Sequence, residues 1–349
     1  LDVPNATALL REIAAALPHL ACLALATPQH LVELQNALQA GAASFVAFPI
    51  DANQFASTVQ RVLQEAPKHQ SRPRRGRMAA LVGLKGGVGR STLAVNMAAA
   101  LRQRIDGDVV GDVVLVEAHH GLSDLSLMLN LLPRHTLASL AQEANLDADV
   151  LQGHLQPHAS KIKVLAAPND LSQLVELPVE TWRLILSHLA AAAAYVVVDT
   201  AAVADPVLSE VLTLADEIIA VTGPDLAGLR STVVLLKSLD EESNVQGRTH
   251  VVLNRAGVRG GVGERAAAAQ VGEPLAAAIP DDPALATFAL NRGVPLVLSH
   301  PRALVSRQIH QLVGRVFDLK AAPLPRTQPE RSWRPFGKRR AAKAVEAGV

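Results

Sequence analysis

The sequence predicts an α/β fold built around a mostly parallel sheet. Short apolar runs rich in Val, Ile and Leu alternate with segments of helical spacing along most of the 349 residues, as expected for strands connected by helices. Hydrophobic residues make up 49% of the chain but aromatic residues only 3%, so the core must be built mainly from Ala, Val and Leu. Such a composition suits parallel strands that are buried on both faces.

The first 67 residues predict a small α/β unit of their own. Helices are expected at residues 6–17, 31–40 and 54–65, and strands at residues 21–27 and 44–48. Residues 68–77 lack apolar side chains and contain Pro73 and Gly76. This stretch is therefore expected to be a linker.

Residues 78–319 predict a larger α/β domain. Residues 320–349 are rich in proline and charge, and they are expected to form a disordered tail. Within the domain, strands are expected at residues 78–83, 109–116, 162–166, 195–199, 217–221 and 249–253, and helices at residues 91–102, 178–190, 209–215, 226–239 and 306–316.

The net charge of +1 hides an uneven distribution. Residues 68–77 carry five basic residues and no acid, and residues 320–349 carry eight basic and two acidic residues. The folded remainder is therefore acidic, which argues against coating of nucleic acid by the folded surface, and no specific nucleic acid is expected as a partner. The basic segments suit contact with anionic lipid at the inner membrane or with an acidic partner, and a solvated linker and tail is the alternative.

Cysteine content and hydropathy bear on the compartment. The single cysteine, Cys22, excludes an internal disulfide framework and favours a reducing cytoplasm. The N-terminus lacks a basic segment followed by an apolar one, so no signal peptide is expected. The longest apolar run, residues 189–198, has ten residues and is too short to span a bilayer. A soluble cytoplasmic protein is the expectation.

A glycine-rich loop lies between the strand expected at residues 78–83 and the helix expected from Ser91. Glycines let backbone N–H groups approach phosphate oxygens, and the start of the helix presents its positive end to the same phosphates. The Ser91 hydroxyl is expected to ligate Mg²⁺ and Thr92 to bond a phosphate oxygen. The loop therefore predicts a nucleotide site, with an ordinary strand–turn–helix connection as the alternative. It consists of Leu84, Lys85, Gly86, Gly87, Val88, Gly89, Arg90, Ser91 and Thr92.

Acidic residues end two of the expected strands. An apolar run ends in Asp199, as in a Walker B element, whose carboxylate holds Mg²⁺ through water. Glu117 ends an earlier strand and is followed by His119 and His120. Adjacent residues on a strand point to opposite faces, which argues against a metal site formed by these two histidines.

Together these motifs resemble the MinD/ParA ATPases, a P-loop NTPase family, over about residues 78–318. The resemblance implies bound ATP or ADP with Mg²⁺, held by Ser91 and Asp199, and catalytic roles for Lys85, Glu117 and Asp199. In that family the early loop lysine, here Lys85, reaches the partner's nucleotide across a dimer. The implied nucleotide contacts are Lys85, Gly86, Gly87, Val88, Gly89, Arg90, Ser91 and Thr92 in the loop, Asn254 at the base, and Pro280 and Asp281 in the loop that closes over the adenine.

Two positions depart from the family pattern. Arg90 stands where the usual loop lysine lies, and arginine is longer, planar and fork-shaped. His119 replaces the second of two acids that help to position the attacking water and Mg²⁺. We therefore expect nucleotide binding with weak or absent ATP hydrolysis.

The N-terminal unit resembles the second half of a receiver domain, on the strength of Thr27 and the Phe48-Pro49 pair. A partial receiver-like unit, a basic linker and a loop without the usual lysine together resemble the CpaE/TadZ proteins of Flp (Tad) pilus assembly. Residues 83–96 and 279–296 look like that group. This resemblance implies a homodimeric localisation factor that recruits the pilus secretion machinery, often at the cell pole.

Two other functions stay open at this point. A partition or division-site positioning ATPase would need a DNA-binding surface or a C-terminal amphipathic membrane helix. A nucleotide-independent interaction scaffold would have an empty or permanently occupied loop.

Overall fold

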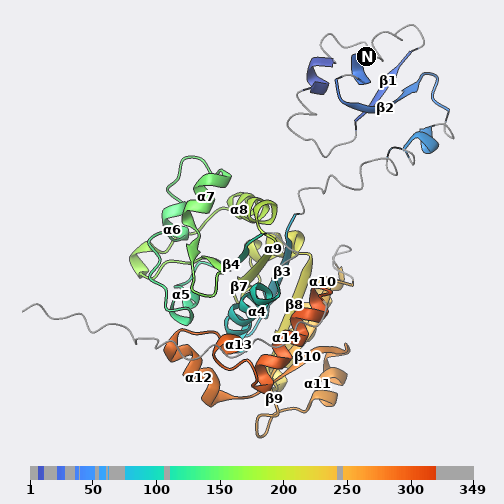
Figure 1. Ribbon diagram of the computed structural model, residues 1–349. Helices are drawn as coiled ribbons and strands as arrows, with labels where there is room; N and C mark the ends of the chain where they lie inside the picture. The colour runs from blue at the N-terminus through green and yellow to red at the C-terminus, as the bar shows by residue number, and fades with distance from the viewer. Residues whose placement is uncertain are drawn as a thin grey trace, which may run out of the picture. The chain divides into compact units, whose positions relative to one another are not determined.

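The computed structural model describes residues 7–11, 22–27, 36–38, 40–51, 55–59, 62, 75–105, 111–241 and 247–319. Figure 1 shows the chain as a ribbon. The chain divides into two compact units, Leu1–Arg74 and Arg75–Val349. In the described part of the chain, no helix combines the length and the apolarity needed to cross a membrane.

The first unit contains a parallel pair of strands, β1 (Cys22–Ala26) and β2 (Ala42–Ala47). Side chains of β2 alternate between buried and exposed, because successive residues of a strand point to opposite faces. Both strands predicted from the sequence are confirmed, the second beginning two residues earlier. Residues 7–11, 36–38, 55–59 and 62 are helical and lie within the three predicted helices, whose other residues fall outside the described part. The receiver-like assignment remains a prediction.

The second unit is built on a single sheet in which eight strands are described, in the order β10-β9-β8-β3-β7-β4-β6-β5. All neighbouring strands are parallel except β5 and β6, which confirms the predicted α/β fold with a mostly parallel sheet. The strands are β3 (Arg77–Val82), β4 (Val113–Ala118), β5 (Gln156–Pro157), β6 (Lys163–Leu165), β7 (Tyr195–Thr200), β8 (Glu217–Thr222), β9 (Thr249–Ala256) and β10 (Leu275–Pro280).

Helices cover both faces of this sheet and create two apolar cores (Figure 1). Along β3, Met78 and Ala80 pack into one core, whereas Ala79 and Leu81 pack into the other. The first core contains α6 (Leu137–Leu140), α7 (Ala148–His154), α8 (Val179–Ala192), α9 (Pro206–Leu214), α10 (Leu226–Glu241) and α11 (Glu264–Val271). The second contains α4 (Arg90–Arg104), α5 (Asp124–Met128), α12 (Pro283–Arg292), α13 (Leu296–Ser299) and α14 (Leu304–Val316).

Several elements differ from the sequence-based expectations. Strand β10 was not predicted because its sequence is alanine-rich and ends in proline, both unfavourable for strands. Helices α5 and α6 have only five and four residues, too few to show a helical period. Residues 75–77, the end of the predicted linker, lie in the second unit, since the Gly76 amide donates to Ala190 and Arg77 begins β3.

Candidate functional site

The predicted site residues gather where the parallel strands of the second unit end. The glycine loop follows β3, Glu117 and Asp199 lie near the ends of β4 and β7, and Asn254 lies near the end of β9. In open parallel sheets this carboxyl edge is where ligands bind. The fold therefore brings together residues that are far apart in the sequence.

The loop has the backbone shape that its glycines permit. Gly87 and Gly89 adopt left-handed conformations, with φ of 76° and 85°. Gly89 is the N-cap of α4 and offers no side-chain hydrogen bond, so the first N–H groups of this helix are not capped by a side chain. A Cβ atom on Gly86 or Gly87 would meet nothing within 4 Å. The space above the loop is therefore open for an anion, as expected for a phosphate site.

Asn254 contacts the backbone of the loop. Its Nδ2 donates to the backbone oxygen of Val88 at 2.7 Å, and a Cβ atom on Gly89 would lie 2.2 Å from the same Nδ2. Asn254 therefore links the end of β9 to the loop, a contact that the sequence did not predict. Its role at the base remains a prediction.

The Arg90 side chain contacts both the end of β3 and the end of β7. Its Nη1 donates to the Gly83 oxygen at 2.8 Å and its Nε to Asp199 Oδ1 at 3.2 Å. The side chain of Arg90 is 12% exposed and that of Asp199 is 1% exposed. The arginine that replaces the usual loop lysine thus forms a buried ion pair with the predicted Walker B carboxylate.

Burial dominates the electrostatics of Asp199. It raises the pKa of this carboxyl above 3.8, although the nearby Ser91 hydroxyl and the Arg90 charge oppose the rise. The second oxygen, Oδ2, is buried without a hydrogen-bond partner among the described residues. Asp199 therefore depends on nearby positive charge to remain ionised.

Glu117 is fully buried and receives four hydrogen bonds. Its Oε1 accepts from the amides of Asp124 and Leu125 at 2.8 and 2.9 Å. Its Oε2 accepts from Ser123 Oγ at 2.6 Å and from the Ala167 amide at 2.9 Å. Both oxygens thus hold the start of α5 and the segment after β6. Its predicted catalytic role remains a prediction.

The charge of Glu117 is stabilised by these contacts and by His119. Burial alone would raise the pKa of Glu117, but the nearby His119 ring and the hydrogen bonds from Ser123 and the Leu125 amide lower it below its ordinary value. His119 Nε2 lies 3.6 Å from Glu117 Oε1, and His119 Nδ1 accepts from the Gly121 amide at 3.0 Å. Burial lowers the pKa of His119, but Glu117, together with the charges of Asp199 and Asp124, more than offsets this and leaves the pKa raised.

Lys85 lies at the surface of the loop. Its Nζ forms an ion pair with Asp225 Oδ1 at 2.5 Å, and the two side chains are 39% and 51% exposed. Asp225 also accepts from the Gly228 amide at the start of α10, and these contacts lower its pKa. Asp225 was not predicted as a site residue from the sequence; its place after the β8 run, in Thr222-Gly223-Pro224-Asp225, was the available signal.

The predicted adenine loop, Pro280 and Asp281, is hydrogen-bonded to the end of β9. The Asp281 amide donates to the Ala256 oxygen at 2.9 Å. Arg255, whose φ of 58° is left-handed, donates from Nε to Asp281 Oδ1 at 3.1 Å. Pro280 therefore ends β10, the strand next to the β9 strand that carries Asn254, and Asp281 directly follows it.

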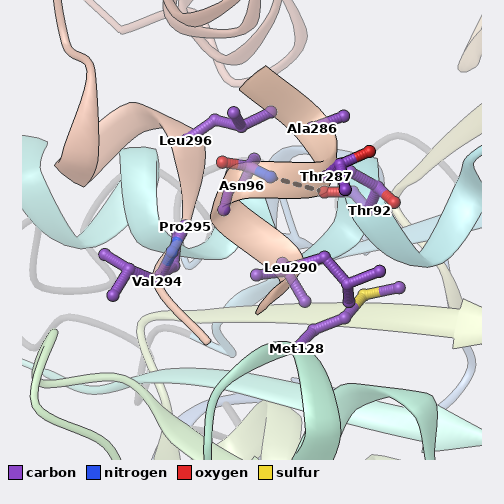
Figure 2. Close-up of a pocket in the computed structure, with 11 residues that line it drawn as sticks. Thr92, Asn96, Met128, Ala286, Thr287, Leu290, Val294, Pro295 and Leu296 are labelled. Atoms are coloured by element: carbon purple, nitrogen blue, oxygen red, sulfur yellow. Dashed lines mark hydrogen bonds between the residues drawn. The ribbon is translucent and has the colours of Figure 1, made fainter. Parts of the chain in front are cut away.

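A cavity of about 160 Å³ lies beside the first turns of α4 (Figure 2). Asn96 Nδ2 donates to the Thr92 oxygen at 2.8 Å, and Asn96 Oδ1 accepts from the Val297 amide. Asn96 thereby fixes α13 against α4. The other lining residues are mostly apolar and come from α4, α5, α12, the start of α13 and the segment before it: Val95, Met128, Ala286, Thr287, Ala289, Leu290, Val294, Pro295 and Leu296.

Comparison with known proteins agrees with this geometry. No protein-family model matches the sequence. The chain is 31% identical over 181 residues to the antiactivator FleN of Pseudomonas aeruginosa, which covers 51% of this chain and 61% of FleN. It is 25% identical over 248 residues to the septum site-determining protein MinD of Synechocystis, covering 66% of this chain and 86% of that MinD.

Solved structures with a similar fold also include ParA and MinD proteins. A ParA family ATPase from Chlorobium tepidum superposes with a TM-score of 0.62 at 26% identity, covering 68% of this chain and 98% of that one. Other proteins of this fold, at 21% identity or less, have been solved with Mg-ADP or ATP bound. The second unit thus has the α/β fold of MinD/ParA-type P-loop proteins, as its motifs predict.

Proposed function

We propose that this MinD/ParA-type domain binds ATP or ADP and acts as a nucleotide-linked localisation or assembly factor with weak or absent ATP hydrolysis. The observation that carries the proposal is the buried ion pair of Arg90 with Asp199, directly below an open glycine loop. The loop supports phosphate binding, and the ion pair engages the acid on which hydrolysis would depend.

Weak hydrolysis is expected because Arg90 and Glu117 already use most of their hydrogen-bonding capacity within the protein. The Arg90 guanidinium is held by both Gly83 and Asp199 through Nη1 and Nε, so among the described contacts only its Nη2 is left for a phosphate. Glu117 already accepts four hydrogen bonds, which leaves it little capacity to orient a water molecule. Positioned acids and bases normally supply a large part of such a reaction.

The decisive experiment compares ATPase rates of the full chain and of Arg90→Lys, beside calorimetric titration with ATP and ADP. We expect binding by the wild-type chain, slow turnover, and faster turnover in Arg90→Lys. Unchanged binding and turnover in Arg90→Lys would show that arginine is no handicap. Absence of both heat and a shift in melting temperature would favour the nucleotide-independent scaffold, because a bound ligand must stabilise the fold.

Lys85 supports a homodimer in this proposal. Its side chain is exposed at the loop, and its ion pair with Asp225 of the same chain is exposed as well. Because an exposed ion pair is weak, Lys85 can leave Asp225 and reach the nucleotide of a second copy. Lys85→Ala should abolish nucleotide-dependent dimerisation in light scattering. Its folding stability should change by only about 0–1 kcal/mol, as for exposed ion pairs. Dimerisation equal to wild type would contradict this role.

The finer assignment is to Flp (Tad) pilus assembly at the pole or at the surface of the inner membrane, with the pilus secretion machinery as partner. Its support is the resemblance of residues 83–96 and 279–296 to the CpaE/TadZ group, together with Arg90. Deletion of the gene should abolish pilus assembly, and a fluorescent fusion should form polar foci. Normal piliation after deletion would remove this assignment.

A positioning ATPase is the second candidate, because FleN and MinD are among the relatives. It predicts that the purified chain binds either DNA with strong salt dependence or anionic vesicles. Neither is required of a factor that binds only the secretion machinery. Salt-sensitive DNA binding would favour this candidate over the first.

A further inference from the structure

We propose that the Arg90 guanidinium supplies at Asp199 the positive charge expected of Mg²⁺, so that nucleotide binds to this chain without a divalent cation. The inference rests on the proposed nucleotide function and concerns how the same site balances its charge. It makes Arg90 a residue that determines the cation requirement.

Two strand ends hold the guanidinium in place. Arg90 is the first residue of α4, so its backbone is fixed by the helix. Gly83 directly follows β3 and Asp199 lies near the end of β7, and these two strands are neighbours in the sheet. The guanidinium bonds to both at 2.8 and 3.2 Å. A lysine has one nitrogen and lacks the rigid fork that makes both contacts in a single plane.

The remaining groups do not fit a divalent ion as well as they fit Arg90. Asp199 Oδ1 is already taken, and Mg²⁺ on Oδ2 would lie beside a guanidinium that stays protonated. Glu117, opposite Asp199 in the sheet register, has both oxygens occupied by four donors.

Arg90 also retains capacity for the ligand. Its Nη2 donates to none of the residues that the structure describes, and the start of α4 is uncapped by any side chain. Arginine suits phosphate oxygens because its N–H groups point in fixed parallel directions. One guanidinium can therefore neutralise Asp199 and contact a phosphate at the same time.

The test is calorimetric titration of the full chain with ADP and with ATP, in Mg²⁺ buffer and in EDTA buffer. For the wild type we expect dissociation constants that agree within about twofold between the buffers, a difference of less than about 0.5 kcal/mol. For Arg90→Lys we expect Mg²⁺ to tighten binding by about tenfold or more. Arg183→Lys is the matched control, because Arg183 pairs with Glu210 between α8 and α9, away from the loop. It should behave like the wild type.

The outcomes distinguish failure of the cation-independence inference from failure of the proposed nucleotide binding. Wild-type binding that tightens about tenfold or more in Mg²⁺ would overturn this inference and leave the proposed function standing. No heat and no melting shift in either buffer would overturn the proposed function, and this inference with it. If Arg90→Lys fails to fold, the wild-type comparison between the two buffers decides alone.

Discussion

Replacement of Glu117 by glutamine tests whether this buried carboxylate is a structural anchor. The two residues have nearly the same shape, so the change removes the charge and one acceptor without opening a cavity. In the wild type, four donors converge on the two oxygens at 2.6–2.9 Å. We expect the substitution to destabilise the second unit.

The size of the stability loss in Glu117→Gln can be estimated from the hydrogen-bond donors that face the carboxylate. If the amide nitrogen takes the place of Oε2, Ser123 Oγ can rotate to accept from it, but the Ala167 N–H is left facing a donor. An unsatisfied buried N–H costs about 1–3 kcal/mol, and bonds to a charged acceptor are worth about 1 kcal/mol more each than bonds to a neutral one. The expected loss of unfolding free energy is therefore roughly 2–5 kcal/mol.

Urea unfolding followed by far-UV circular dichroism measures this loss directly. Hydrogen exchange at the Asp124 and Leu125 amides should accelerate in the variant, since these groups lose a charged acceptor. Glu273→Gln is the control, because Glu273 is exposed and should lie within about 0.5 kcal/mol of wild type. A loss below about 1 kcal/mol, with unchanged exchange at both amides, would refute the structural role.

The same anchor has a pH signature. The pKa of Glu117 is lowered in the folded state, so the folded chain binds the proton less readily than the unfolded chain. The stabilisation is complete above the unfolded value of about 4.5 and is lost as the pH falls through the folded pKa. Glu117→Gln should therefore flatten the acidic limb of the stability curve. An identical limb in wild type and variant would contradict this reasoning.

Two further predictions concern other positions in the second unit. Gly89→Ala should lower the free energy of unfolding by about 1–3 kcal/mol, because φ is 85° and the new Cβ would lie 2.2 Å from Asn254 Nδ2. The control Gly86→Ala, whose Cβ would meet nothing within 4 Å, should retain wild-type stability in the same urea unfolding experiment. Equal losses in the two variants would contradict the predicted clash. Burial, and secondarily the Arg104 charge, lower the pKa of His310 from 6.5 to about 4, so unfolding free energy should fall as the pH drops from about 6.5 to 4 and rise again with pH. His310→Gln should be flatter in that window, and parallel curves would show that His310 is not responsible.

Much of the fold could be predicted because its signals are local. The runs that became β3, β7 and β8 are continuous apolar stretches bounded by polar residues, which identify buried parallel strands without tertiary information. Strand β10 could not be identified in this way, since its alanines carry no strand preference and it forms by pairing with β9. The short helices α5 and α6 likewise depend on contacts made after the sheet has formed.

The glycine loop, its strand–helix setting and the arginine at position 90, where the family pattern has lysine, are all evident in the sequence alone. Backbone conformation near glycine and the start of a helix are set within a few residues, so the loop and the helix that follows it could be predicted from their own segment. What Arg90 contacts was decided only by the tertiary structure. Asp199 lies 109 residues away, and its pairing with Arg90 exists because β3 and β7 lie side by side in the sheet. The same holds for Glu117, whose donors come from α5 and from the segment after β6, and for Lys85, which meets Asp225 only where β8 ends.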